Sequence, residues 1–152
     1  MDIILFSGNN VIIDKPKVIV DGMNKDFGYG FYCTNLERQA KRWALTKRHG
    51  HVVNVYSYTK DDSLNTLVFN EMTDEWLDFV VDCRRGKTHN YDCVEGPMAD
   101  DTIWNYVDDF VRGVITREAF WELVKFKYPI HQIVFCTEES LKQLRFERSY
   151  SL

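Results

Sequence analysis

The residues best suited to bind or transform a ligand gather in three short stretches of the chain. The first is Asp-Phe-Gly-Tyr-Gly-Phe-Tyr-Cys-Thr at residues 26–34, which combines an acid, two glycines and several aromatic residues. Glycine tolerates backbone conformations that other residues avoid and lets a ligand approach the chain closely. Residues 31–33 indicate a short buried strand. This stretch is a candidate ligand cradle, and a tight turn that leads into a core strand is the alternative.

The second and third stretches each place polar side chains at the end of a predicted strand. Residues 91–94 predict a short strand that runs into Gly96-Pro97, and Asp100 and Asp101 follow directly before a helix. Asp is a good N-cap, so capping is one interpretation of this pair and a functional carboxylate is the other. In the third stretch, Gln132 lies at the entry of the buried strand 131–137, where it either faces a ligand or bonds the local backbone.

Hydrophobic periodicity predicts the elements that must position these stretches, and their mixture is α+β. Strands are predicted at 3–6, 52–58, 67–69, 91–94 and 131–137, with an edge strand at 146–152. Apolar stripes predict helices at 36–49, 73–83, 103–111, 116–124 and from 137 onward. The residues 34–37 fit a capping box for the first helix, and Thr73, Thr116 and Thr137 are predicted N-caps of later ones. Trp43 is assigned to the core.

Length and composition fit one domain that spans residues 1–152. The chain is 45% hydrophobic and 28% charged, and it is long enough to bury a core. No apolar run reaches the length of a membrane span. The apolar run at residues 1–6 is too short for a signal peptide, and it contains an acid. We therefore expect a cytoplasmic protein with no membrane partner.

The distribution of charge and the spacing of the cysteines limit which partners and metal sites we expect. Residues 60–109 hold 13 acids and 4 bases, which argues against a nucleic-acid footprint across the whole domain. The basic residues of the first helix are either a solvated face or a contact to RNA or DNA. The four cysteines form no Cys-x-x-Cys pair, and the four histidines do not complete a zinc pattern. We expect reduced, buried thiols and no metal site.

Three landmarks, in this order, resemble the ADP-ribosyltransferase superfamily: Leu5–Gly8, Gly28–Thr34 and Gln132–Phe135. More narrowly, the chain is similar to a small bacterial family of uncharacterised domains placed in that superfamily. The shared motifs cover most of the chain, and they include Gln-Ala-x-x-Trp-Ala at 39–44 and Asp-x-Val-x-Gly-Pro-x-Ala-Asp-Asp at 92–101. The resemblance implies a split, strongly bent pair of small β-sheets with helices around them, and NAD in the cleft between the sheets.

Carried over residue by residue, the superfamily's three catalytic positions fall on Ser7, Tyr32 and Gln132. The resemblance implies that Gly8 offers its backbone to the nicotinamide amide, that Tyr32 stacks on the nicotinamide ring and that Gln132 bonds the ribose. The residues expected around NAD are Ser7, Gly8, Asn9, Phe27, Gly28, Gly30, Phe31, Tyr32, Thr34 and Asp100. Because Gln132 has no formal charge, we add the inference that Asp101 or Asp100 stabilises the oxocarbenium-like ribosyl cation.

The resemblance implies an enzyme that uses NAD as a substrate and transfers ADP-ribose to a macromolecular acceptor. Bacterial relatives of this kind often act as toxins or effectors, so an antitoxin or immunity protein is an expected partner. Two departures from the superfamily weaken this expectation: Ser7 replaces a longer His or Arg, and Gln132 replaces a Glu. They motivate the alternative of a nucleotide-binding or protein-interaction module with the same fold and little or no turnover.

Overall fold

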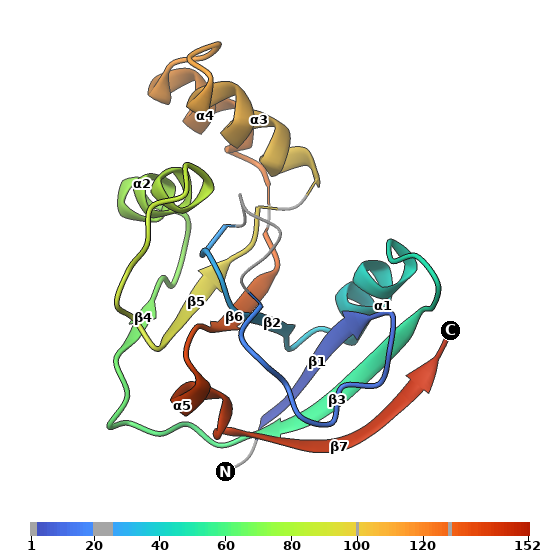
Figure 1. Cartoon of the computed structure of the whole chain (residues 1–152). Helices are drawn as coiled ribbons and strands as arrows, with labels where there is room; N and C mark the ends of the chain where they lie inside the picture. The colour runs from blue at the N-terminus through green and yellow to red at the C-terminus, as the bar shows by residue number, and fades with distance from the viewer. Residues whose placement is uncertain (1–2, 20–25, 100, 128) are drawn as a thin grey trace.

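The computed structural model describes residues 3–19, 26–99, 101–127 and 129–152, which form an α+β fold (Figure 1). Its strands are β1 (Ile3–Asn9), β2 (Phe31–Thr34), β3 (Val52–Tyr58), β4 (Thr66–Val68), β5 (Cys93–Pro97), β6 (His131–Phe135) and β7 (Leu144–Ser151). Its helices are α1 (Glu37–Leu45), α2 (Asp74–Arg84), α3 (Asp101–Val111), α4 (Arg117–Val124) and α5 (Glu138–Leu141). The α+β prediction is therefore confirmed.

The strands form one mixed sheet with a narrow joint in its middle. Their order is β4-β5-β6-β2-β1-β3-β7, and β4 and β5 are the parallel pair. β1 pairs with β3 along its whole length, but with β2 through the single register pair Phe6–Thr34. Next to this pair, the Ser7 hydroxyl donates to the Tyr32 carbonyl oxygen at 3.0 Å. We call this joint the seam. The two small sheets expected from the sequence are thus two halves of one sheet that part at the seam.

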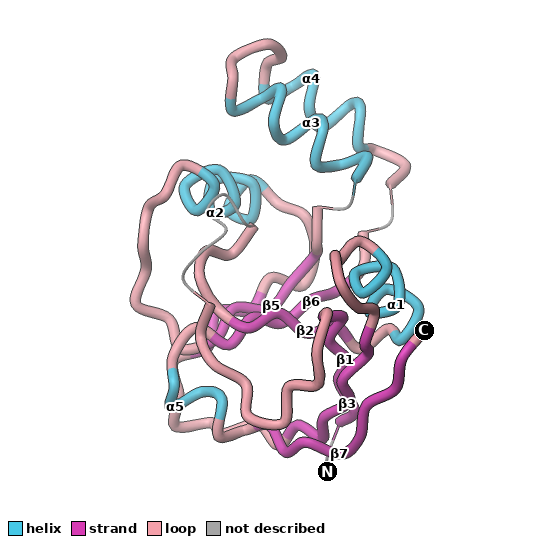
Figure 2. Tube along the Cα trace, turned by 45° about the vertical axis from the view of Figure 1, so that its right-hand side comes forward, coloured by secondary structure: helices cyan, strands magenta, loops and turns pink. Residues whose placement is uncertain are grey.

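Separate helices cover the two halves of the sheet (Figures 1 and 2). On one half, α2, α3 and α4 bury a large apolar cluster that includes Trp76, Ile103, Phe120 and Val134. On the other half, Ala40 and Ala44 of α1 pack on β3. A third cluster, around Phe31 and Tyr56, lies under the segment 10–19 and α5. The two groups of helices thus cover separate clusters, whereas the third cluster joins both halves of the sheet on its other side.

The helix ends show which capping signals were correct. Thr73, Thr116 and Thr137 each accept a backbone N–H bond at the N-cap of α2, α4 and α5, so these three predictions are confirmed. The capping box at 34–37 is wrong, because α1 begins at Glu37 and its N-cap residue makes no side-chain bond. The hydroxyl of Thr34 instead donates to the carbonyl oxygen of His131 at 3.1 Å, across the β2–β6 pair.

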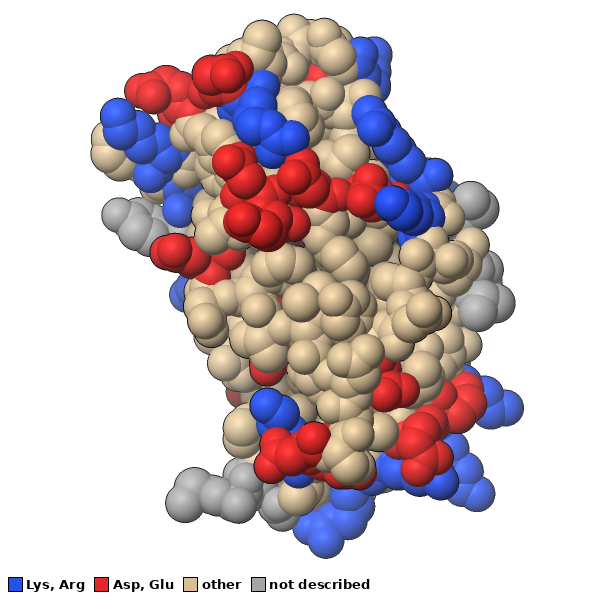
Figure 3. All heavy atoms as spheres, turned by 90° about the vertical axis from the view of Figure 1, so that its left-hand side faces the viewer, with Lys and Arg blue, Asp and Glu red and all other residues tan. Residues whose placement is uncertain are grey.

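Two other predictions concern element boundaries. The first helix ends at Leu45, four residues before the predicted end, and Trp43 is half-buried instead of lying in the core. The predicted edge strand at 146–152 is confirmed as β7, which pairs with β3 at the end of the sheet. On the face that carries α2, acidic and basic side chains are mixed toward both ends and uncharged side chains fill the band between them (Figure 3). This face carries no uniform basic surface.

Gly8 lets α1 approach the sheet closely, and its replacement tests that packing. A Cβ atom at Gly8 would lie 2.1 Å from the Ala40 carbonyl oxygen and 2.5 Å from the Ala44 nitrogen. Since both atoms are helix backbone, we expect Gly8→Ala to lower the free energy of unfolding by about 1–3 kcal/mol. Urea denaturation measures the change. Ile4→Ala, at an exposed position of the same strand, is the control with an expected change within roughly 0.5 kcal/mol. Equal stability of Gly8→Ala and the wild type would contradict this packing.

Candidate functional site

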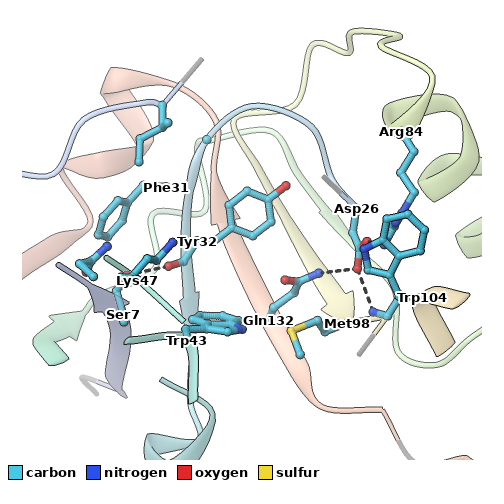
Figure 4. A pocket seen from close by; sticks show the side chains of 15 residues that line it. Ser7, Asp26, Phe31, Tyr32, Trp43, Lys47, Arg84, Met98, Trp104 and Gln132 are labelled. Carbon is cyan, nitrogen blue, oxygen red and sulfur yellow. Dashed lines mark hydrogen bonds and ion pairs between the residues drawn. The ribbon is translucent and has the colours of Figure 1, made fainter. Parts of the chain in front are cut away.

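A pocket of about 260 Å³ opens at the seam, between α1 on one side and α2 and α3 on the other (Figure 4). We call it the seam pocket. It is lined by Ser7, Gly8, Asn9, Ile19, Asp26, Gly30, Phe31, Tyr32, Trp43, Lys47, Arg84, Met98, Ala99, Trp104 and Gln132. The pocket thus collects residues from both halves of the sheet and from three helical segments.

A buried carboxylate organises one side of the seam pocket. Asp26 accepts hydrogen bonds from the Arg84 guanidinium, from the Ala99 backbone N–H at 2.8 Å and from the Gln132 side chain at 3.3 Å. The side chains of Asp26 and Arg84 are both more than nine-tenths buried. Removal of either partner would leave an uncompensated charge inside the protein. The ion pair therefore joins the end of α2, the segment after β5 and the start of β6.

The Asp26 carboxylate also sets the orientation of the Gln132 amide. An ionised carboxylate only accepts hydrogen bonds, so the amide nitrogen of Gln132 must face it. The amide oxygen then points away from Asp26, toward the side of the pocket that holds Ser7 and Trp43 (Figure 4). Gln132 therefore presents an acceptor to a ligand in the pocket.

The position of Arg84 follows from the way α2 is anchored. The helix begins at the Thr73 cap, and the Trp76 indole N–H donates to the Pro97 carbonyl oxygen at 2.9 Å. Its apolar face is buried, and Arg84 is the last helical residue. A cation at this helix end is favoured by the macrodipole. The fold also gives this cation a specific partner, because it brings the Arg84 guanidinium to the Asp26 carboxylate.

Tyr32 lines the seam pocket, and its phenol is bound to the backbone of its own loop. Its hydroxyl donates to the Gly28 carbonyl oxygen at 2.6 Å and accepts from the Phe27 N–H at 3.2 Å. Burial, with a smaller contribution from the charge of Asp26, raises the pKa of the Tyr32 phenol well above its usual value, so the hydroxyl stays a donor. Tyr32 thus closes the loop 27–32, and the half-buried Trp43 supplies a flat aromatic surface in the pocket.

The other sequence-predicted residues fall into three groups. Ser7, Gly8, Asn9, Gly30, Phe31 and Gln132 line the seam pocket together with Tyr32. Phe27, Gly28 and Thr34 are not among the lining residues: Phe27 packs on Phe69 and Phe79, Gly28 takes a left-handed φ of 82° beside His89, and Thr34 bonds β6. Asp100 lies outside the described residues, and Asp101 is described only as the first residue of α3.

Two of the predicted residues carry side-chain bonds that occupy them within the protein. The Ser7 hydroxyl donates to the Tyr32 carbonyl oxygen, and the Asn9 amide oxygen accepts from Asn54 at 2.9 Å. Sequence reasoning missed Asp26, Trp43, Lys47, Arg84 and Trp104 as pocket residues. Asp26 was visible as the acid at the start of the Gly-rich stretch, but its partner on α2 is 58 residues away.

The described residues contain no group of three or more His, Cys, Asp or Glu side chains that could hold a metal ion. All four cysteines are free, and burial raises the pKa of Cys83 and Cys136 to about 12. Thiols with such pKa values stay protonated near neutral pH and are poor nucleophiles. Within the described part of the chain, no helix is long and apolar enough to cross a membrane.

A family model with the description "Protein of unknown function (DUF3990)" matches residues 3–146, which include every residue that lines the seam pocket. No curated protein matches the chain.

The buried pair of Asp26 and Arg84 gives a prediction about stability. Asp26→Ala leaves the Arg84 charge buried without its partner, so we expect the free energy of unfolding to fall by about 3–5 kcal/mol. The exposed pair of Arg117 and Asp78 offers a matched control, since Asp78→Ala should cost under about 1 kcal/mol. Urea denaturation of both variants makes the comparison. Equal losses of unfolding free energy in Asp26→Ala and Asp78→Ala would contradict the buried ion pair of Asp26 and Arg84.

Proposed function

The chain belongs to the DUF3990 family, and from its pocket we propose that it is an NAD-dependent ADP-ribosyltransferase that binds NAD at the seam. The observation that carries the proposal is convergence in space. Gly8, Trp43 and Gln132 come from β1, α1 and β6, and they line one pocket. A backbone strand, a flat ring and an oriented amide are the groups that a nicotinamide riboside would use. The resemblance noted in the sequence supports the same ligand.

Trp43 is the proposed stacking surface for the nicotinamide ring. Its indole lines the pocket together with Ser7 and Gln132 (Figure 4), whereas the hydroxyl of Tyr32 is bound to the backbone of its own loop. Aromatic stacking adds affinity beyond the burial of apolar area. The role that the resemblance implied for the Tyr32 ring is therefore assigned to Trp43, and Tyr32 holds the loop that borders the pocket.

The proposed reaction breaks the bond between the ribose C1′ and the nicotinamide nitrogen. Nicotinamide leaves with the bonding electron pair, and the ribose becomes oxocarbenium-like. A nucleophile of the acceptor then forms a bond to C1′ and loses its proton to solvent. The Gln132 amide oxygen accepts a hydrogen bond from a ribose hydroxyl and places a partial negative charge near the cation. The Asp26 carboxylate behind Gln132 polarises the amide and strengthens that charge.

The position of Asp26 also explains why the residue at 132 is an amide. A Glu at this position would place a second carboxylate at hydrogen-bond distance from Asp26. Two carboxylates in one site repel each other and do not both ionise. Asp26 and Gln132 thus form a matched pair, in which Asp26 supplies the formal charge that we had expected from Asp100 or Asp101.

The proposal extends to the setting of the reaction. The acceptor is a macromolecule, the protein acts as a bacterial toxin or effector, and an antitoxin or immunity protein blocks the pocket. A cytoplasmic location is part of the proposal, and it is supported by four free cysteines in a chain of this size.

A second candidate function is a module that binds NAD or another nucleotide without turnover. It is favoured by two observations at the catalytic positions. The Ser7 hydroxyl is occupied by the Tyr32 carbonyl oxygen, and the Gln132 side chain carries no formal charge of its own. Calorimetry with NAD and an assay of released nicotinamide separate the two functions, because the module would bind without release.

The transferase proposal is tested by nicotinamide release from NAD in the presence of cell extract as a source of acceptor. Gln132→Ala removes the acceptor that stabilises the ribosyl cation, so we expect kcat to fall about 10²-fold. Trp43→Ala removes the stacking surface and should raise KM roughly 3–10-fold. Trp121→Phe is the matched control, because this tryptophan bonds Asp74 outside the pocket. The proposed site would be overturned if neither Gln132→Ala nor Trp43→Ala changed the release of nicotinamide.

The pairing of Asp26 with Gln132 gives a separate prediction. Gln132→Glu alone should abolish most activity, since it places two carboxylates together. Adding Asp26→Asn exchanges the amide and the carboxylate, so the rate of nicotinamide release by the double variant should be at least about 10-fold higher than that of Gln132→Glu. Initial rates of nicotinamide release measure both variants. A double variant no more active than Gln132→Glu contradicts the pairing.

A further inference from the structure

Arg84 has more hydrogen-bonding capacity than its described neighbours use. One terminal nitrogen, Nη2, donates to Asp26, whereas Nε and Nη1 are buried and have no hydrogen-bond partner among the described residues. Arg84 is 8% exposed and lines the seam pocket. Because a buried guanidinium N–H without an acceptor is costly, these donors mark a place where an acceptor from outside the chain would be stabilised.

The contact with Trp104 leaves those donors available. The guanidinium carbon of Arg84 lies 4.0 Å from the centre of the Trp104 ring. A cation–π contact is an attraction to the ring electrons and gives Nε and Nη1 no hydrogen-bond acceptor atom. Trp104 is 38% exposed and lines the pocket together with Arg84, so both side chains lie at the wall that a ligand would meet.

The charge balance of the seam pocket selects an anion. Its described lining residues include two cations, Arg84 and Lys47, and one carboxylate, Asp26. Lys47 is exposed just after the end of α1 and forms no ion pair with a described residue. Asp26 offsets one of these two cations, which leaves one net positive charge among the described lining residues. A net positive pocket with unused N–H donors suits phosphoryl oxygens.

We infer that Arg84 is a phosphoryl-binding residue, and that Nε and Nη1 receive oxygens of a diphosphate group that enters the seam pocket. The inference rests on the proposed function for the identity of the ligand, since NAD carries such a group between its two nucleosides. It adds the region where the diphosphate lies: beside α2 and α3, across the pocket from Trp43 (Figure 4). Lys47 lies on the opposite side, where it adds long-range attraction.

The test is calorimetric titration of the full chain with inorganic pyrophosphate. Arg84→Lys keeps the positive charge and a donor for Asp26, but it removes the Nε and Nη1 donors. We expect this variant to bind pyrophosphate at least 10-fold more weakly than the wild type. Arg117→Lys is the matched control, because Arg117 pairs with Asp74 and Asp78 outside the pocket. Equal pyrophosphate affinity of Arg84→Lys and the wild type would overturn the inference.

The outcomes also separate this inference from the proposed function. If pyrophosphate binds through Arg84 and no nicotinamide is released from NAD, the phosphoryl site stands and the transferase fails. If nicotinamide is released and pyrophosphate does not bind, the transferase stands and the phosphoryl site fails. If Arg84→Lys does not fold, the Arg84 Nε–H resonance of the wild type gives the same decision. A shift on addition of pyrophosphate supports the inference, and an unchanged resonance overturns it.

Discussion

The hydrogen bonds to the Asp26 carboxylate are the interaction on which the site depends. One side chain holds the end of α2 through Arg84, the segment after β5 through Ala99, and the start of β6 through Gln132. These segments are far apart in the sequence, and no backbone pairing joins α2 to β6. A buried ion pair is weak evidence for stability in general, but loss of one partner is expensive. The carboxylate therefore fixes geometry: it aligns the Gln132 amide and holds the Arg84 guanidinium at the pocket wall.

The seam supplies the space in which that geometry is useful. β1 and β2 share one register pair, so the sheet opens immediately beside Ser7 and Gly8. Each half of the sheet has its own helices and its own apolar cluster, and the pocket lies where the two groups of helices part. A continuous β1–β2 ladder would close this space. The same local feature thus explains the split of the sheet and the position of the candidate site.

Local signals in the sequence predicted much of the fold and part of the site. The caps at Thr73, Thr116 and Thr137 were correct because each depends on a few neighbouring residues. The cap at Thr34 was wrong because this residue still belongs to β2, where its hydroxyl bonds β6, and the helix begins three residues later, at Glu37. The Asp26–Arg84 pair likewise depends on tertiary packing. Hydrophobic periodicity placed Trp43 in the core, because the pattern is the same for a helix face that covers a pocket and for one that packs on a sheet. Sequence thus predicts elements better than the side chains that meet between them.

The central claim is that one dinucleotide occupies the seam pocket with both of its halves in contact with named residues. The most direct measurement is a crystal structure of the protein with a non-hydrolysable NAD analogue. The account predicts the nicotinamide ring against Trp43, a ribose hydroxyl on the Gln132 amide oxygen and the diphosphate beside Arg84. An analogue bound on another surface, or one that leaves these three side chains without contact, would contradict it.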